Sequence, residues 1–282
     1  MADRILTPPT VEAPLLAWLR DVLQPTSRTR VKELLTRGLV HVNGAPVTRH
    51  DHLLRPGDRV TISHSPAKPS LVTILHEDDA ILALDKPAGL LSVATDAEKH
   101  DTAFVRLAEH LAAHRGGRPY VLHRLDRETS GVLLFARTAE VRDTIQAGWD
   151  AVEKQYLAVV EGTPRPAEGT VRNHLREGRD LRVRAVPAGG DAKPASTHYR
   201  VLRSGNGMSL VEVTLETGRK HQIRVHLAGL GCPVIGDRAY GSRTDPVRRL
   251  GLHAWKVLIT HPRSGERITI ESRLPRVLAS LV

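Results

Sequence analysis

The chain opens with two stretches in which apolar residues recur every three or four positions, the spacing of an amphipathic helix. The first stretch contains Leu15, Leu16, Leu19, Val22 and Leu23 and ends at Pro25. The second follows Ser27, a favourable N-cap residue, and ends at Gly38. Short strands are predicted next at Leu39–Val42 and Arg59–Ile62, with turns at Asn43-Gly44 and Pro56-Gly57-Asp58. Residues 1–63 therefore read as a small α/β unit.

The pattern changes after this unit. Residues 64–70 are polar and contain prolines, which predicts a linker. Beyond it, strand-like apolar runs alternate with a few helical ones. The predicted strands are Leu71–Leu75, Ile81–Leu84, Val132–Phe135, Tyr156–Val160 and Leu210–Leu215, and the predicted helices run through Phe104–Leu111, Val141–Ile145 and Ile223–Leu230. Strands outnumber helices without regular βαβ alternation, so residues 71–282 predict an α+β domain with a mixed, largely antiparallel sheet.

Composition narrows the classes of function. The chain has 41 Lys and Arg against 31 Asp and Glu, a net charge of +10 that favours a polyanionic partner. The single cysteine, Cys232, excludes a disulfide framework and a zinc site built from several thiolates. Only nine residues are Phe, Trp or Tyr, too few for an aromatic base-stacking platform. No apolar run is long enough to cross a membrane or serve as a leader, so we expect a cytoplasmic protein without membrane association.

The second predicted helix is basic. It carries Arg28, Arg30, Lys32 and Arg37, which on charge alone is equally typical of a solvated helix face. The segment also resembles the S4 domain, a small RNA-binding module. The resemblance covers residues 11–63 and rests on Ser27-Arg28, Lys32, Leu35, Gly38, Val42-Asn43-Gly44 and Pro56-Gly57-Asp58. It implies that Arg28 and Lys32 contact RNA phosphates.

Two polar runs are candidates for chemistry. His123–Gly131 places an acid and two arginines directly before a buried strand, although turn residues and surface ion pairs are an ordinary explanation. Thr217–Leu227 predicts a helix start that brings His221 and Arg224 to one face. Cations are unfavourable at a helix N-terminus, so an anionic partner is expected there. An arginine in this place could meet an aspartate from another strand and hold it ionised.

Other candidate sites are weaker. The run His76-Glu77-Asp78-Asp79 holds side chains that can bind metals, but adjacent residues point in different directions and no further cluster has ligand spacing. Ala188-Gly189-Gly190 matches neither a P-loop nor a dinucleotide-binding pattern, and no nucleophile elbow occurs. Cys232, beside Pro233 in an apolar stretch, is typical of a packed thiol. We therefore expect neither a metal nor a cofactor.

Six motifs in one order make the larger domain similar to RNA pseudouridine synthases of the RluA group, over residues 71–275. They are Asp85-Lys86-Pro87-Ala88-Gly89-Leu90; His123-Arg124-Leu125-Asp126 with Thr129-Ser130-Gly131; Lys154-Gln155-Tyr156-Leu157-Ala158; Thr217-Gly218-Arg219 with His221-Gln222-Ile223-Arg224; Gly236-Asp237-Arg238-Ala239-Tyr240-Gly241; and Leu252-His253-Ala254-Trp255 with His261-Pro262. Asp85 departs from the Asn usual in the group, a difference expected to affect local hydrogen bonding only.

The resemblance implies the fold of a pseudouridine synthase and assigns roles to individual residues. Asp126 would be the catalytic aspartate, Arg224 its partner, and Tyr156 the tyrosine that packs on the base and helps remove the C5 proton. Arg124 would enter the RNA where the uridine has left the stack. Ile223 and Leu227 would wall the pocket. The isomerisation breaks the N1–C1′ bond and rejoins the uracil through C5, so it requires no cofactor.

The substrate implied is structured RNA, with ribosomal RNA of the large subunit favoured over transfer RNA and no protein partner required. Five arginines near the middle of the domain predict a basic loop or hairpin that clasps a stem: Arg172, Arg176, Arg179, Arg182 and Arg184. Two other classes stay open. A non-catalytic RNA-binding or ribosome-assembly factor would not need Asp126, Tyr156 and Arg224 together. A nuclease or glycosidase would require a second carboxylate or a metal, and only Glu128 is close in sequence.

Overall fold

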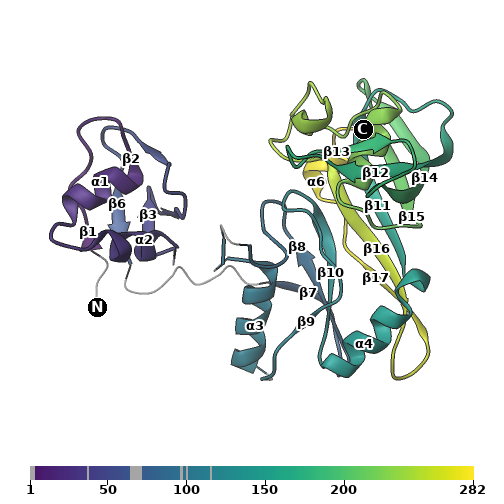
Figure 1. Cartoon of the computed structure of the whole chain (residues 1–282), viewed down its shortest axis with the longest axis horizontal. Coiled ribbons are helices and arrows are strands. Elements are labelled where there is room, and N and C mark those ends of the chain that lie inside the picture. Colours follow the sequence, from purple (N-terminus) through teal and green to yellow (C-terminus); the bar gives the residue numbers. More distant parts are fainter. Residues whose placement is uncertain (1–3, 37, 64–71, 96–97, 100, 115) are drawn as a thin grey trace. The chain divides into compact units, whose positions relative to one another are not determined.

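The structure, a computed structural model, describes residues 4–36, 38–63, 72–95, 98–99, 101–114 and 116–282. The chain divides into two units (Figure 1). One comprises Met1–Leu71 and Val93–Arg106, and the other comprises Val72–Ser92 and Leu107–Val282. The predicted linker, residues 64–70, and Arg37 lie outside the described residues, so the domain limits drawn from the sequence stay predictions.

The first unit contains two short helices and six very short strands. In chain order they are β1 (Arg4–Ile5), β2 (Ala13–Pro14), α1 (Leu15–Val22), α2 (Arg28–Thr36), β3 (Val40–Val42), β4 (Ala45–Pro46), β5 (Leu53–Leu54) and β6 (Val60–Ile62). Four strands form an antiparallel sheet in the order β1-β6-β3-β4, and β2 pairs with β5. The helices and strands thus follow the order predicted from the sequence.

The predicted helical faces are the buried ones. Leu15 and Leu19 of α1 and Val31 and Leu35 of α2 are fully buried in one cluster with residues of β3 and β6. The turn between β3 and β4 has positive φ at Asn43 (52°) and Gly44 (84°), the geometry that allows a two-residue hairpin. On the outer face of α2, Arg28 and Lys32 are exposed and have no acidic partner among the described residues.

The second unit is built on a large sheet with few helices. Its strands are β7 (Thr73–Glu77), β8 (Ile81–Lys86), β9 (Tyr120–Val121), β10 (Ser130–Ala136), β11 (Glu153–Glu161), β12 (Glu168–Glu177), β13 (Val183–Val186), β14 (Lys193–Gly205), β15 (Met208–Leu215), β16 (Leu252–Thr260) and β17 (Arg267–Glu271). Its helical segments are α4 (Ala139–Ala147), η1 (Trp149–Ala151), α5 (Gln222–Gly229), η2 (Arg238–Tyr240) and α6 (Arg276–Ala279), while α3 (Ala103–His114) spans the division between the units.

The large sheet has 11 strands and is mixed. The main path is β13-β12-β14-β15-β11-β16-β10-β8-β7, with β17 beside β16 and β9 beside β10. Its pairs are antiparallel except β10 with β16, two strands that are far apart in sequence but neighbours in space (Figure 1). The prediction of a mixed, largely antiparallel sheet is confirmed.

Strand β10 fixes the position of the segment that precedes it. All seven residues of β10 are buried, as expected for an apolar strand inside a sheet. Gly131 has a φ of +114°, and a Cβ on it would lie 2.1 Å from the carbonyl oxygen of Ala254 in β16. Only glycine allows so close an approach of the two backbones. The chain before Gly131, which contains Asp126, is therefore anchored at the centre of the sheet.

The sequence underestimated the length and number of strands. Strand β7 continues to Glu77 rather than ending at Leu75, β11 begins at Glu153, and β12, β13, β14, β16 and β17 were not predicted as strands. Thr138 is the N-cap of α4, as predicted, and its hydroxyl accepts a hydrogen bond from the Val141 amide. Within the described part of the chain, no helix is both long and apolar enough to span a membrane.

Candidate active site

An open pocket of about 470 Å³ lies in the second unit where the segment before β10 meets β11 and the start of α5. It contains five of the six residues predicted for the larger domain: Arg124, Asp126, Tyr156, Ile223 and Arg224. The other lining residues are Leu125, Thr129, Leu215, Gly218, Arg219, His221, Gln222 and Leu252. The structure thus brings together residues from four of the six sequence motifs.

Leu227, also expected in the wall, is not among the lining residues. It is buried on α5 one turn beyond Ile223. Four residues of helix advance the chain by about 6 Å, and the pocket lies at the N-terminal end of α5. Ile223 therefore reaches the pocket while Leu227 packs in the protein interior.

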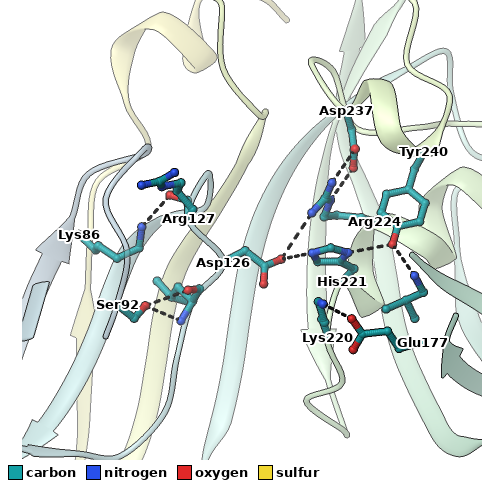
Figure 2. A network of polar contacts seen from close by, with 12 residues as sticks. Lys86, Ser92, Asp126, Arg127, Glu177, Lys220, His221, Arg224, Asp237 and Tyr240 are labelled. Carbon is teal, nitrogen blue, oxygen red and sulfur yellow. Dashed lines mark hydrogen bonds and ion pairs between the residues drawn. The ribbon is translucent and has the colours of Figure 1, made fainter. Parts of the chain in front are cut away.

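The backbone around Asp126 is held from two sides (Figure 2). The Ser92 hydroxyl donates to the carbonyl of Leu125 at 2.8 Å and accepts from the amide of the same residue at 2.9 Å. The buried Lys86 ammonium donates to the carbonyl of Arg127 at 3.0 Å and also to those of Pro87 and Leu90. These contacts fix the peptide units on both sides of Asp126, so its side chain has a defined direction.

Lys86 is unusual because a lysine is seldom fully buried. Burial lowers its pKa to about 8, a shift that the charges of Glu128 and Asp126 oppose. Its three hydrogen bonds go to backbone carbonyls, so the ammonium serves as a fixed donor for a loop rather than as a free cation. This gives a physical reason for a Lys-Pro pair in the first motif of the domain.

The Asp126 side chain is one-third exposed in the pocket and faces two nitrogen groups. Nη1 of Arg224 and Nε2 of His221 each lie 3.7 Å from the same oxygen, Oδ2 (Figure 2). Sequence spacing placed these two side chains on one face, and both contact Asp126. At 3.7 Å both contacts are longer than a hydrogen bond, and no hydrogen bond reaches either carboxylate oxygen among the described residues, so the carboxylate keeps its capacity to accept.

Arg224 has a second, tighter partner that the sequence reasoning missed. Its Nε and Nη2 donate to Oδ2 and Oδ1 of Asp237 at 2.6 and 2.8 Å, and Asp237 is almost completely buried. Burial alone would lower the pKa of Arg224, but the hydrogen bonds and charge of Asp237 and the charge of Asp126 raise it. The guanidinium also lies over the ring of Tyr240, 4.9 Å from its centroid. Asp237 therefore orients Arg224, which in turn contacts Asp126.

Asp237 stands in a motif quoted from the sequence, but nothing in one sequence identifies its partner. The expectation that Arg224 meets an aspartate from another element holds for both acids. The bidentate contact, however, is with Asp237 rather than Asp126. A tight pair with Asp126 would occupy both of its oxygens, whereas the observed arrangement leaves Asp126 accessible.

Tyr156 lies on β11 at the pocket floor and is mostly buried. Burial, with a smaller contribution from the charge of Asp126, raises its pKa well above the usual value. The phenol is therefore protonated and neutral throughout the physiological range. It presents a flat apolar ring beside the carboxylate, a surface suited to a planar base.

Other motif residues serve the fold. His123 accepts a hydrogen bond from the Leu134 amide at 3.0 Å and packs against Trp149, and burial lowers its pKa to about 4. The Ser130 hydroxyl lies 2.8 Å from Nδ1 of His253. Asp85, the departure from the usual Asn, accepts from the Ser272 hydroxyl at 2.8 Å. Cys232 is buried, and burial raises the pKa of its thiol, as a packed cysteine requires.

The basic segment predicted to clasp RNA is the hairpin of β12 and β13. Three of its five arginines have acidic partners: Arg172 with Glu216, Arg176 with Asp191, and Arg184 with Asp180. Arg179 and Arg182 have none among the described residues. Asp180 lies close to these arginines in sequence, whereas Glu216 and Asp191 come from other segments of the folded chain.

One group of potential metal ligands is assembled at the β7–β8 turn. Ligand atoms of Asp78, Asp79 and His261 lie within 4.8 Å of one another. Asp78, however, already accepts from two backbone amides of the turn and contacts His76 at 2.5 Å. Nδ1 of His261 accepts from a backbone amide at 3.1 Å, so the neutral ring carries its proton on Nε2, which faces Asp78 at 3.3 Å. The carboxylate of Asp78 is thus already occupied by structural contacts, while Nε2 of His261 is buried without a hydrogen bond in the described part of the chain.

Comparisons with known proteins identify one enzyme family. Residues 80–229 match the RNA pseudouridylate synthase family. The chain is 34% identical to an uncharacterised RNA pseudouridine synthase of Bacillus subtilis over 91% of this chain and 88% of that protein. It is 35% identical to ribosomal large subunit pseudouridine synthase D of Nitrosomonas europaea, over 94% of this chain and 82% of that one.

A comparison with solved structures identifies the same family. The human RNA pseudouridylate synthase domain containing protein 4 superposes with a TM-score of 0.60 at 29% identity, covering 73% of this chain and 90% of the human chain. A pocket that joins Asp126, Arg224 and Tyr156, the residues to which the sequence resemblance assigned roles, is thus found in a chain whose sequence and fold both match one enzyme family. This chain belongs to the RNA pseudouridine synthases, which are isomerases.

Proposed function

We propose that the chain converts specific uridines in structured RNA into pseudouridine, with Asp126 as the catalytic carboxylate. The supporting observation is a partly exposed aspartate in an open pocket, with one oxygen near two nitrogen groups and a buried tyrosine beside it. The reaction cleaves the N1–C1′ bond, rotates the uracil and forms a C1′–C5 bond, so no group is gained and no electron is transferred. A single carboxylate acting on a glycosyl species suits this chemistry.

The neighbouring residues support that carboxylate in different ways. Arg224, fixed by Asp237, keeps a positive charge near Oδ2, where it stabilises negative charge that develops during the reaction. Tyr156 offers a neutral ring on which the detached uracil stacks. Its high pKa favours packing over direct proton abstraction, so its help with the C5 proton requires a group that accepts a proton from it.

Arg124 is the residue we assign to base flipping. A uridine inside a helix cannot reach Asp126, so it must leave the stack. Arg124 lines the pocket and is itself exposed, which places a cation where the vacated position in the RNA would lie. Ile223 supplies the apolar wall of the pocket, whereas Leu227 is not among the residues that line it.

Two further surfaces suit RNA. We propose that the first unit acts as an S4-like RNA-binding module, with Arg28 and Lys32 of α2 contacting phosphates. Both are exposed and have no acidic partner in the described part of the chain. In the second unit, the β12–β13 hairpin would contact the RNA backbone mainly through Arg179 and Arg182, whose charges are unpaired among the residues that the structure describes.

We propose ribosomal RNA of the large subunit as the substrate. Relatives from Nitrosomonas europaea, Neisseria meningitidis and Xanthomonas campestris are each named ribosomal large subunit pseudouridine synthase D, at 32–35% identity. Such a substrate agrees with the expected cytoplasmic location and with activity on RNA without a protein partner. Transfer RNA is the second candidate.

The test uses deproteinised ribosomal RNA from a strain that lacks the gene. The RNA is mapped for pseudouridine, then incubated without added cofactor with the wild-type protein or with Asp126→Asn. We expect the wild type to restore specific pseudouridines and the variant to restore none while remaining folded. Restoration by both proteins would refute the role of Asp126. If neither free RNA, ribosomal particles nor transfer RNA is modified, the binding-factor alternative replaces the enzyme, and RNA cleavage sensitive to a chelator would indicate a nuclease.

A further inference from the structure

His221 lies beside the catalytic aspartate in a strained conformation. It is the residue immediately before α5, with φ of 53° and ψ of 16°, in the left-handed region. A histidine in this region costs free energy that glycine or asparagine largely avoids. Such strain persists where surrounding contacts hold it and is concentrated at functional sites. The contacts of the ring show what holds it here.

Tyr240 fixes one ring nitrogen. The Tyr240 hydroxyl lies 2.8 Å from Nδ1 of His221, and its oxygen accepts a hydrogen bond from the Val183 amide at 3.1 Å (Figure 2). Since the amide can only donate, the hydroxyl hydrogen is free to point at Nδ1. In this arrangement Nδ1 is the acceptor, and the proton of the neutral imidazole lies on Nε2.

The other nitrogen faces the carboxylate. Nε2 of His221 lies 3.7 Å from Oδ2 of Asp126, the oxygen that Arg224 also approaches. The opposite tautomer would direct a lone pair at a carboxylate oxygen, which is repulsive. Contacts of this length in a substrate-free active site shorten when the substrate binds.

We propose that His221 is a positioning residue for Asp126: held by Tyr240 in its Nε2–H form, it donates to Oδ2 and so directs Oδ1 toward the uridine. This inference rests on the proposed role of Asp126. His221 and Arg224 thus form a pair of donors on one oxygen, so the carboxylate cannot rotate freely about its χ2 angle. The reacting oxygen is presented in one orientation, which is the benefit of a preorganised site.

Burial favours the neutral form of the His221 ring. Burial lowers the pKa of His221, and Arg224 and Lys220 lower it further, while Asp126 and Asp237 oppose the shift. Lys220 is itself paired with Glu177 of β12, and Tyr240 contributes a neutral hydroxyl. A neutral imidazole has two possible tautomers, and the Tyr240 hydroxyl and the Asp126 carboxylate together favour the Nε2–H form.

The decisive experiment compares His221→Gln with His221→Asn. The Gln amide reaches the position of Nε2 and can still donate to Asp126, whereas the shorter Asn reaches only the position of Nδ1. Asn tolerates a positive φ and keeps a contact with Tyr240, so a purely structural role predicts that Asn is the better replacement. Our inference predicts the reverse order. We expect His221→Asn to lower the single-turnover rate about 10- to 100-fold with little change in KM, and His221→Gln to lower it severalfold less.

The pH dependence of the rate of Tyr240→Phe provides a second test. Without the hydroxyl the neutral ring can adopt either tautomer, while the protonated ring again donates from Nε2. The rate of Tyr240→Phe relative to wild type should therefore rise as pH falls through the pKa of His221, which burial holds below the usual histidine value. A ratio that does not change with pH would contradict the proposal.

Nitrogen-15 NMR of labelled protein tests the tautomer without reference to activity. The His221 signal is identified by its loss in His221→Gln. An unprotonated Nδ1 at neutral pH supports the inference, and a protonated Nδ1 overturns it. If Asp126→Asn is inactive but His221→Asn equals or exceeds His221→Gln, only this inference fails. If Asp126→Asn keeps the wild-type rate, the proposed function of the site fails instead.

Discussion

Two aspartates of the second unit each lie among histidine and arginine side chains, yet their surroundings differ. Asp78 accepts from two backbone amides and contacts both His76 and His261, so its carboxylate is saturated. Asp126 has two ion-pair contacts of 3.7 Å, both longer than a hydrogen bond. The same residue types thus build a rigid turn in one place and an accessible carboxylate in the other. Unused hydrogen-bonding capacity, rather than composition, distinguishes Asp126, the proposed catalytic residue, from Asp78.

The largest effect is expected from Asp237→Asn. This change removes the charge that pairs with the buried Arg224 guanidinium, which leaves an uncompensated cation beside Asp126. We expect the free energy of unfolding to fall by about 3–5 kcal/mol and the rate of pseudouridine formation by roughly 100-fold. Chemical denaturation and single-turnover assays on the folded variant measure the two effects. An unchanged rate would show that Arg224 does not depend on Asp237.

Asp78→Asn should separate stability from activity. Hydrogen bonds from the Ile81 and Ala80 amides and from His76 overcome the effect of burial and lower the pKa of Asp78 to about 2. Because the folded pKa lies below the unfolded value, this stabilisation is present above about pH 4 and is lost as pH falls toward 2. At neutral pH the free energy of unfolding of Asp78→Asn should be roughly 2 kcal/mol lower than that of the wild type. Between about pH 4 and pH 2 it should also change less with pH.

The rate of pseudouridine formation per folded molecule of Asp78→Asn should equal that of the wild type. Urea unfolding between pH 2.5 and 7 tests the stability half of this prediction, and the assay on ribosomal RNA tests the other half. A variant that keeps its fold but loses activity would remove the distinction between the two aspartates.

A smaller effect is expected from Ser92→Ala, which leaves the amide and carbonyl of Leu125 without their partner. The free energy of unfolding should fall by about 1–2 kcal/mol, since two buried polar groups lose a hydrogen bond. The rate should fall about tenfold because the loop holding Asp126 loosens. Ser92→Thr, which keeps the hydroxyl, is the matched control. Equal rates for the two variants would mean that the hydroxyl does not position the loop.

The smallest effect is expected on the β12–β13 hairpin. Arg182→Gln should weaken RNA binding a few-fold and reduce the salt dependence of the affinity by about one counterion, because its charge is not paired within the described residues. Arg184→Gln, which removes a charge already paired with Asp180, should change both quantities less. Filter binding over a range of salt concentrations measures the difference. The reverse order would contradict the assignment of Arg182 to RNA.

The sequence predicted what local patterns encode. Apolar spacing located α1, α2, α4 and α5 and the buried β10, and the order of the motifs singled out Asp126, Tyr156 and Arg224. It could not show that Asp237 holds Arg224, that Tyr240 holds His221, or that Glu216 and Asp191 pair with hairpin arginines. Each of these contacts joins residues from separate segments, and side-chain pairing across a fold leaves no periodic signal in one sequence. The strained φ of His221 is likewise visible only in the structure.

Of the two aspartates Asp126 and Asp78, we propose that only Asp126 takes part in the reaction. The direct measurement is single-turnover pseudouridine formation by Asp126→Asn and Asp78→Asn, side by side, on ribosomal RNA lacking the modification. We predict no detectable product with folded Asp126→Asn and the wild-type rate per folded molecule with Asp78→Asn. Substantial product with Asp126→Asn would contradict the account, as would an equal loss in both variants.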